Sequence, residues 1–355
     1  MKFFVSAGEV SGDLHLSYLV NSIKKKHSDA EFYGVAGEHC RKAGVGIVQD
    51  ISELAIMGFT EIIKKYSFLK KKVSEYLEFI KKEGIEKVIL VDYGGFNLKF
   101  LELLKKEIPD IEVFYYIPPK LWVWGESRIK KLRLADHIMV IFPWEVEFYK
   151  KHGIEAVYFG NPFAERYEVV KRTGKSILLL PGSRKQEITS LMPVLLELVK
   201  KHPEENFILK LSSKEHLMWA GSIDYKNITV EISDSLSSCV EKCKVAVAAS
   251  GTVTLELALM GIPTVVIYKT GFINAFIAKY ILKVGFVSLP NLTLNREVYP
   301  ELLQDRCNVN EIEKAIEAFE LNKEKTEKDI LEVRKELSGE NIVESYGDFL
   351  MKGEK

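Results

Sequence analysis

The sequence predicts an α/β protein made of two Rossmann-like domains, each built on a parallel sheet with helices on both faces. Short runs rich in Val, Ile and Phe alternate with longer helix-patterned segments from end to end. The chain has 355 residues, more than one hydrophobic core usually organises, and its 47% hydrophobic and 28% charged residues are ordinary for a folded protein. We expect the domain boundary where the chain becomes polar, around residues 161–175.

The expected strands are short apolar runs, and the segments between them are long enough for helices. In the first half of the chain the strands are expected at 2–7, 31–36, 87–92, 112–117, 137–142 and 156–160. In the second half they are expected at 176–182, 207–212, 228–232, 245–250 and 264–268. From residue 310 onward, mixed charges at helical spacing predict surface helices that close the fold.

Charge and cysteine content exclude several classes of protein. Lys+Arg and Asp+Glu both total 50, so the formal net charge is zero and no overall field attracts nucleic acid. The four cysteines lack the second pair or the nearby His that would complete a zinc site, and we expect them to be reduced and buried. Glu9 and Asp13 interrupt any signal-peptide core, and Lys279 and Lys283 interrupt the longest apolar stretch, so a cytoplasmic protein is expected.

Ligands of open α/β sheets gather at the carboxyl ends of the strands, and the loop after the first expected strand is unusual. In "SAGEVSGD", Gly8 and Gly12 bracket a loop before a helix, whose backbone N–H groups suit an anion or a sugar hydroxyl. Ser11 and Gly12 are therefore candidate substrate-binding residues. The spacing is not G-x-G-x-x-G, so a dinucleotide site is unsupported. Tight-turn glycines, with Ser11 and Asp13 as helix caps, are the structural alternative.

Asp92 ends the apolar run "KVILVD" and is the candidate general base. A carboxylate at the edge of a sheet is partly desolvated, which raises its pKa and suits proton abstraction. The alternative is that Asp92 caps the following turn and that Asn97 caps a helix.

The loop "LLLPGSRKQEI" is a candidate diphosphate site. The strand ends at Pro181 and Gly182, and Ser183 is expected to open a helix that carries Arg184. Backbone donors and a guanidinium would then converge where a diphosphate can lie. Simple capping by Ser183 explains the serine but not the arginine.

In "AASGTVTLELALMGIPTVVIY", a buried strand turns at Ser250, Gly251 and Thr252 into a short helix that carries one carboxylate, Glu256. One turn into the helix, this carboxylate can accept hydrogen bonds from the two hydroxyls of a ribose. The alternative is a solvent-facing Glu that favours the helix dipole.

An aromatic loop and two amphipathic stretches suit acylated ligands and a membrane surface. Trp122 and Trp124 alternate on a Pro-stiffened loop, where they either line an apolar ligand site or pack beneath the loop. The stretches 57–77 and 271–285 combine an apolar stripe with lysines, which fits either core packing or contact with anionic lipid.

Taken together, the motifs resemble those of the lipid-A-disaccharide synthases, inverting glycosyltransferases of the GT-B fold. The resemblance runs nearly end to end and includes "AGEVSGD", "MGFTE", "DYGGFN", "YYIPPKLWVWGESRIKK", "LLPGSRKQEI", "ASGTVTLELAL" and "VSLPNLTLNREVYPELLQ". It implies two Rossmann-like domains facing across a cleft, with residues 1–165 on the acceptor side and 166–335 on the UDP-sugar donor side. It also implies that a terminal helix in 336–355 returns to the N-terminal domain.

The implied reaction moves 2,3-diacylglucosamine from its UDP conjugate to 2,3-diacylglucosamine 1-phosphate, which forms the β(1→6) lipid A disaccharide and releases UDP. Asn291 is carried over from the family pattern as a polar substrate contact. There is no D-x-D metal motif, so Arg184 and the helix starts are expected to serve in place of a metal, and no cofactor is expected. An anionic membrane surface at the inner face of the cytoplasmic membrane is the expected location, and oligomer formation is left open.

Two departures from the family pattern affect these expectations. Family members often carry a second Asp three places after the first, where this chain has Gly95, so Asp92 inherits the base role as the remaining carboxylate. Asn161 stands where the family commonly has His, so no role passes to it. A nucleotide-sugar 2-epimerase and a non-catalytic nucleotide-sugar sensor are the alternative functions. The epimerase would need no acyl site or membrane patch, and Asp92 at the end of a strand disfavours the sensor.

Overall fold

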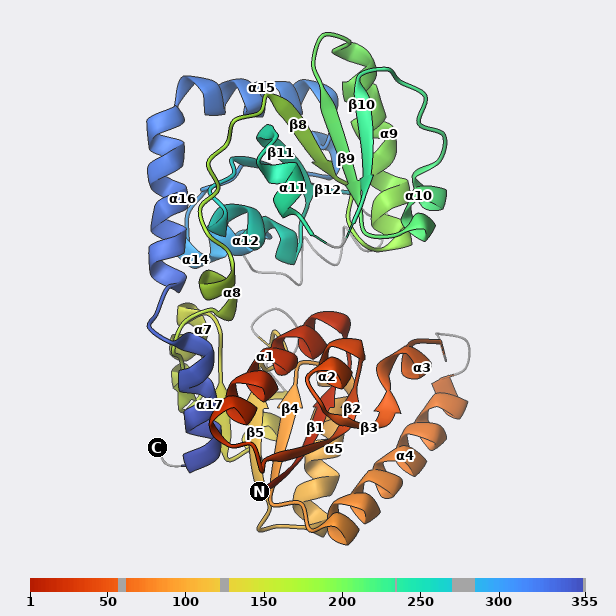
Figure 1. Cartoon of the computed structure of the whole chain (residues 1–355), viewed down its shortest axis with the longest axis vertical. Coiled ribbons are helices and arrows are strands. Elements are labelled where there is room, and N and C mark those ends of the chain that lie inside the picture. Colours follow the sequence, from red (N-terminus) through yellow and green to blue (C-terminus); the bar gives the residue numbers. More distant parts are fainter. Residues whose placement is uncertain (57–61, 122–127, 234, 270–284, 354–355) are drawn as a thin grey trace. The chain divides into compact units, whose positions relative to one another are not determined.

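The computed structural model describes residues 1–353 apart from 57–61, 122–127, 234 and 270–284, and for 54–56 and 62–70 it describes the backbone alone. The chain divides into two compact units (Figure 1). The N-terminal unit comprises Met1–Pro162 with Gly339–Lys355, and the C-terminal unit comprises Phe163–Ser338. Each contains a parallel sheet with helices on both faces, which confirms the predicted α/β class with two Rossmann-like units.

The N-terminal unit has a seven-stranded sheet in the order β3-β2-β1-β4-β5-β6-β7. In that order the strands are Gly46–Asp50, Glu31–Ala36, Lys2–Ala7, Lys87–Val91, Glu112–Tyr116, His137–Met139 and Ala156–Val157. The helices are α1 (Val10–Lys26), α2 (Glu38–Lys42), α3 (Ile51–Ile56), α4 (Ile62–Glu83), α5 (Gly94–Glu107), α6 (Ile129–Leu132), α7 (Pro143–Lys151) and α17 (Ile342–Lys352). The strand order reverses between β1 and β4, which makes their carboxyl ends the expected ligand crevice of this unit.

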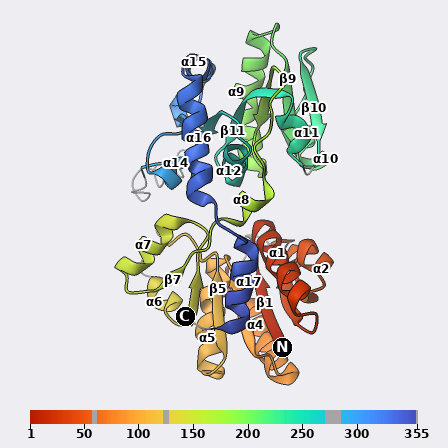
Figure 2. The ribbon, with the colours of Figure 1, turned by 60° about the vertical axis from the view of Figure 1, so that its left-hand side comes forward.

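Side chains of the central strands point alternately to two helical layers. Phe4, Leu90 and Tyr115 belong to the core formed with α4, α5, α6 and α7. Tyr116 points to the opposite face, where its ring centroid lies 5.3 Å from that of Tyr346 in α17. Figure 2 shows α17 lying across this sheet. Both faces are covered, which explains why the central strands β1, β4 and β5 consist mostly of apolar residues.

The terminal helix α17 is anchored to the N-terminal unit by polar contacts as well as by aromatic rings. The Tyr346 hydroxyl donates to the carbonyl of Val140 and accepts from the backbone N–H of Phe159 at 3.2 Å. The Lys87 ammonium donates to the Leu350 carbonyl at 2.9 Å, which satisfies an otherwise unpaired carbonyl at the end of the helix. The last helix therefore completes a face of a sheet whose strands come from the first half of the chain.

The C-terminal unit repeats the same plan with six strands in the order β10-β9-β8-β11-β12-β13. In that order they are Ile228–Ile232, Phe207–Leu211, Ser176–Leu180, Cys243–Ala249, Thr264–Tyr268 and Glu301–Leu303. The helices are α9 (Lys185–Lys201), α10 (Lys214–Ala220), α11 (Ser237–Val240), α12 (Thr252–Leu259), α14 (Leu289–Leu294), α15 (Val309–Leu321) and α16 (Lys323–Leu337); α8 (Pro162–Arg166) and the 3-10 turn Gln304–Arg306 complete the chain. The order reverses between β8 and β11.

Two edge strands, β3 and β13, were not expected from the sequence. In β3 the only buried residue is the polar Gln49, while the other four residues are exposed or half-buried, and β13 has only three residues. Neither carries the apolar run that marks a strand buried on both faces. An edge strand has only one neighbouring strand and is partly exposed to solvent, so its sequence need not be apolar. Seven of the expected strands end earlier than predicted; the largest differences are in β6, which ends at Met139, and β7, which ends at Val157.

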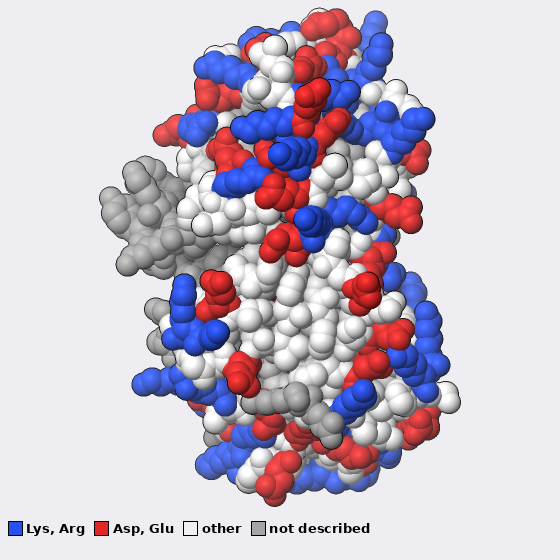
Figure 3. Space-filling model, turned by 90° about the vertical axis from the view of Figure 1, so that its left-hand side faces the viewer, with Lys and Arg blue, Asp and Glu red and all other residues white. Residues whose placement is uncertain are grey.

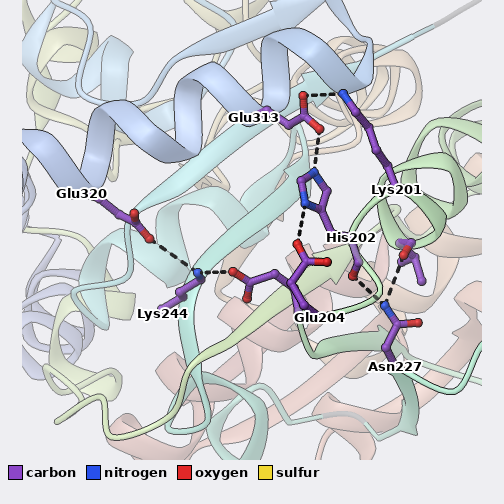
Figure 4. A network of polar contacts seen from close by, with 9 residues as sticks. Lys201, His202, Glu204, Asn227, Lys244, Glu313 and Glu320 are labelled. Carbon is purple, nitrogen blue, oxygen red and sulfur yellow. Dashed lines mark hydrogen bonds and ion pairs between the residues drawn. The ribbon is translucent and has the colours of Figure 1, made fainter.

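A polar network covers the amino edge of the C-terminal sheet (Figure 4). The His202 ring contacts Glu313 at 2.6 Å and Glu204 at 3.1 Å, and Lys244 at the start of β11 pairs with Glu205 at 2.8 Å. The hydrogen bond to Glu313 is the main reason that the pKa of His202 is raised. This edge is opposite to the carboxyl ends of the strands, so we interpret the network as structural.

Charges of both signs are interspersed on the side of the C-terminal unit that carries α16 (Figure 3). Arg296, for example, pairs with Asp329 at 3.0 Å and with Glu332 at 2.9 Å. Such mixing agrees with the formal net charge of zero. Among the helices that the structure describes, none is both long and apolar enough to cross a membrane.

Candidate active site

The four unusual loops follow β1, β4, β8 and β11, the strands that flank the order reversals of the two sheets. In the N-terminal unit this places Ser11 and Gly12 beside Asp92. In the C-terminal unit it places Ser183 and Arg184 beside the loop of Ser250, Gly251 and Thr252 and the helix of Glu256. Each unit therefore gathers its candidate residues at the position where open α/β sheets bind ligands.

The backbone at Asp92 is strained and clamped. Asp92 and the following Tyr93 both have left-handed φ angles, 44° and 47°, which non-glycine residues rarely adopt. The Asp92 carbonyl accepts hydrogen bonds from the Tyr115 hydroxyl at 2.8 Å and from the Asn97 amide at 3.1 Å. Asn97 also accepts from the Ser6 hydroxyl at 2.7 Å, which ties β1 to the loop after β4. Asn97 thus holds the loop together from within α5. It does not cap this helix, whose N-cap is Tyr93.

The surroundings of the Asp92 carboxyl raise its pKa from 3.8 to about 6. Burial is the main cause, and the negative charge of Glu9 adds to it, while Lys120 acts in the opposite direction. A carboxyl group with a pKa near 6 is ionised at neutral pH and is still basic enough to accept a proton in a reaction. Glu9 and Lys120 were not among the predicted residues, although Glu9 also follows β1 and the strand-end rule could have found it.

The glycines of the first loop permit close packing. Gly12 lies within α1, and a Cβ there would meet the Val91 side chain at 3.4 Å. Ser11 is exposed at the start of the same helix. Asp13 does not cap α1, because its carboxylate accepts the backbone N–H groups of Gly37 at 2.7 Å and His39 at 2.9 Å, at the start of α2.

The third loop differs from expectation. The helix α9 begins at Lys185 with Arg184 as its N-cap, and Ser183 precedes it. Glu187 folds back so that its carboxylate accepts the N–H groups of Ser183 at 3.1 Å and Arg184 at 3.3 Å. These two donors, which were expected to face a diphosphate, are occupied by the chain itself. The Arg184 side chain remains 76% exposed, with a guanidinium nitrogen 3.5 Å from the Glu187 carboxylate.

The fourth loop leaves the start of a helix open. α12 begins at Thr252 with Gly251 as its N-cap, and a glycine has no side chain to accept the first N–H groups. Gly251 and Thr252 are both exposed. The Ser250 hydroxyl donates to the Val287 carbonyl at 3.2 Å. The helix start can therefore donate to an anion.

Glu256 is half-buried between Leu255 and Leu257, and its carboxylate accepts a hydrogen bond from Tyr167 at 2.8 Å. The pKa of Glu256 is raised, because the effect of burial exceeds the opposing effects of the Tyr167 hydrogen bond and the Lys210 charge. The carboxylate thus has a defined orientation and is not a solvent-facing helix residue. Tyr167 lies in the polar segment before β8, and no local sequence pattern pointed to it.

Asn291 is fully buried and bonded to its own unit. Its side-chain oxygen accepts the N–H groups of Val298 and Tyr299, both at 2.8 Å, and its amide donates to the Tyr299 carbonyl and to Glu301, also at 2.8 Å. Its hydrogen-bonding groups are thus engaged within the chain. Trp122, Trp124 and most of the two amphipathic stretches lie outside the described residues.

Comparison with known proteins relates this geometry to a family. A protein-family model described as lipid-A-disaccharide synthetase matches residues 3–350. A lipid-A-disaccharide synthase of Geobacter metallireducens is 32% identical over 99% of this chain and 97% of its own length. One from Nitrosococcus oceani is 34% identical over 90% of this chain and 87% of its own.

Solved structures share the fold at low identity. A UDP-GlcNAc 2-epimerase from Neisseria meningitidis, bound to UDP-GlcNAc, aligns over 100% of both chains with a TM-score of 0.64 and 13% identity. MurG from Acinetobacter baumannii aligns over 99% of both chains with a TM-score of 0.60 and 13% identity. At such identities the likeness concerns the fold alone.

Proposed function

The chain belongs to the lipid-A-disaccharide synthetase family, and we propose that its two loop sites divide the family's reaction between them. The reaction transfers 2,3-diacylglucosamine from its UDP conjugate to 2,3-diacylglucosamine 1-phosphate with inversion, which yields the β(1→6) lipid A disaccharide 1-phosphate and UDP. An attacking hydroxyl needs a base, and a leaving diphosphate needs positive or dipolar groups. The N-terminal unit supplies the first and the C-terminal unit the second.

Asp92 is the proposed general base. Its carboxylate takes the proton from the 6-hydroxyl of the acceptor as that oxygen attacks the anomeric carbon of the donor. The pKa of about 6 and the clamped loop support this role, since a base must be ionised and correctly oriented before it can react. Ser11 and Gly12, at the neighbouring strand end, are the proposed acceptor contacts.

Glu256 is the proposed ribose ligand of the donor. Its second oxygen is free to accept from a ribose hydroxyl while Tyr167 holds the first, or the ribose displaces Tyr167. The exposed guanidinium of Arg184 and the open start of α12 at Ser250, Gly251 and Thr252 are proposed to stabilise the departing diphosphate. Because Glu187 occupies the backbone donors at Ser183, that residue contributes less than the sequence suggested.

The position of the half-buried Asp92, whose pKa is raised to about 6, at the strand-order reversal of the first sheet carries this proposal. The test is a single-turnover measurement of UDP release from UDP-2,3-diacylglucosamine, with and without 2,3-diacylglucosamine 1-phosphate. We expect release to require the acceptor and the disaccharide to appear at the same rate. Release of UDP, or epimerisation of the sugar, at an equal rate without acceptor would contradict a synthase.

We propose in addition that the protein associates peripherally with the anionic inner face of the cytoplasmic membrane. The acylated substrates and the lysines of the stretch 57–77 support this location. The protein should sediment with anionic vesicles at low salt and be released at high salt, because screening weakens surface attraction. Neutral vesicles are the control, and equal sedimentation with both kinds at low salt would contradict the proposal.

A further inference from the structure

Glu301, the first residue of β13, holds an internal cluster of hydrogen-bond donors. One carboxylate oxygen accepts from the Ser288 N–H at 2.9 Å, the Ser288 hydroxyl at 2.7 Å and the Asn291 amide at 2.8 Å. The other accepts from the Val287 N–H at 2.9 Å. An ionised carboxylate accepts only, so four donors directed at it fix both its orientation and the path of the chain from 287 to 291.

The cluster is held from the other side by the segment before β13. Asn291 donates to Glu301 while its oxygen accepts the N–H groups of Val298 and Tyr299. The Tyr299 hydroxyl in turn donates to the Ile262 carbonyl at 2.6 Å, and this ring is fully buried. Glu301 therefore sits between a rigid segment and the Val287–Ser288 peptide, and it transmits the position of one to the other.

Val287 connects this cluster to the proposed donor site. Its N–H donates to Glu301, and its carbonyl accepts the Ser250 hydroxyl at 3.2 Å. Ser250 follows β11 directly and precedes α12, the helix whose open start is proposed to receive the diphosphate. The Val287–Ser288 peptide is thus held on both sides, because its N–H donates to Glu301 at 2.9 Å and its carbonyl accepts the Ser250 hydroxyl.

We propose that Glu301 is a positioning residue of the donor site, which acts through the Val287–Ser288 peptide and the Ser250 hydroxyl to fix the open start of α12 for the diphosphate of UDP. The inference rests on the proposed function, because it requires UDP to contact the start of α12, which directly follows Ser250. Glu301 itself does not touch the donor in this arrangement. Without its carboxylate, the Ser288 N–H loses its acceptor and the Val287–Ser288 peptide can rotate. The Ser250 hydroxyl then loses the carbonyl that ties the start of α12 to this segment.

The test is a double-mutant cycle on UDP affinity, measured by calorimetry. Ser250→Ala and Glu301→Ala should each weaken UDP binding by roughly 3- to 10-fold, the scale of one hydrogen bond. The double variant should bind UDP no more than about 2-fold more weakly than the poorer single variant, because both changes remove the same contact. A purely structural Glu301 would instead give multiplied effects.

Two further variants separate stability from position. Tyr299→Phe removes a buried hydrogen bond from the same segment but leaves the Glu301 contacts in place, so it should lower the melting temperature without changing UDP affinity. Glu301→Gln keeps the shape and one acceptor oxygen but faces the Val287 N–H with an amide donor. It should weaken UDP binding by roughly 2- to 5-fold with a smaller loss of stability, and it carries the test if Glu301→Ala does not fold.

The outcomes distinguish a failure of the proposed donor site from a failure of the positioning role of Glu301. Unchanged UDP affinity in Ser250→Ala would remove Ser250 from the donor site, and the role of Glu301 would fall with it. Weakened binding in Ser250→Ala together with additive effects in the cycle, or unchanged binding in both Glu301 variants, would overturn the positioning role alone.

Discussion

Replacing Asp92 by Asn should make the protein more stable and less active. The pKa of Asp92 is raised from 3.8 to about 6, so the folded protein binds this proton more tightly than the unfolded chain does. The resulting stabilisation is fully present below the unfolded pKa near 4 and is lost as the pH rises through about 6. A difference of roughly two pKa units corresponds to about 3 kcal/mol. The neutral Asn does not lose this contribution, and at pH 8 the variant should gain up to about 3 kcal/mol in unfolding free energy.

The same substitution should abolish most of the turnover. General base catalysis typically contributes about 100- to 10,000-fold, and Asn keeps the shape of the side chain while it removes the basicity. In the unchanged protein, turnover should fall by about tenfold for each pH unit below 6, because only the ionised carboxylate can accept the proton. UDP affinity should stay the same, since the proposed donor contacts lie in the C-terminal unit.

The measurements are urea unfolding followed by circular dichroism at pH 4 and pH 8, UDP release for turnover, and calorimetry for UDP binding. Asp110→Asn is the matched control: Asp110 is exposed, and its replacement should change neither stability nor rate. Equal stability of Asp92→Asn and the original chain at pH 8 would refute the argument from burial. Near-normal turnover would show that the base lies elsewhere, and loss of UDP binding would mark Asp92 as structural.

Three further outcomes are expected. Glu256→Ala should weaken UDP binding by about 1 to 3 kcal/mol in calorimetry without unfolding the protein, and unchanged affinity would return Glu256 to a structural role with Tyr167. Gly95→Asp should raise the melting temperature slightly, because a Cβ there meets nothing within 4 Å and an acid in the first turn of α5 interacts favourably with the helix dipole. The added negative charge should also raise the pKa of Asp92, so the acid limb of the turnover profile should move to higher pH. Glu313→Gln should lower the unfolding free energy more at pH 6 than at pH 9. The hydrogen bond to Glu313 raises the pKa of His202, so it stabilises the fold at pH values below the ordinary pKa of histidine, and this stabilisation is lost as the pH rises through the raised pKa. Equal losses at both pH values would contradict this reasoning.

The sequence by itself determined the fold class and the family. Hydrophobic runs of strand length alternating with helical spacing are local properties, and a strand buried on both faces must be apolar throughout, so the central strands β1, β4, β8 and β11 were evident. Residues after these strands could be proposed as site residues because parallel strands end at one edge of a sheet. The motifs quoted from the sequence led to the family that the comparisons show.

The tertiary structure decided which of these side chains are available to a ligand. The Glu187 carboxylate accepts hydrogen bonds from the N–H groups of the third loop, and the Asn291 amide donates to the Glu301 carboxylate. Tyr167 orients Glu256 from 89 residues away in the chain. The contact of Glu187 is local, because Glu187 stands three residues after Arg184, at the spacing of a capping box. The pairs Asn291–Glu301 and Tyr167–Glu256 have no signal in the local pattern of either partner.

The difference has one physical cause. Backbone periodicity, turn preference and helix capping depend on residues within a few positions of one another, whereas a hydrogen-bond partner or a desolvated environment depends on which distant segments meet. The pKa of Asp92 illustrates this, because burial beneath neighbouring elements raises it and Glu9 adds a charge from another loop. The sequence thus placed a carboxyl group at the end of a strand, and only the packing around it raised the pKa of that group to about 6.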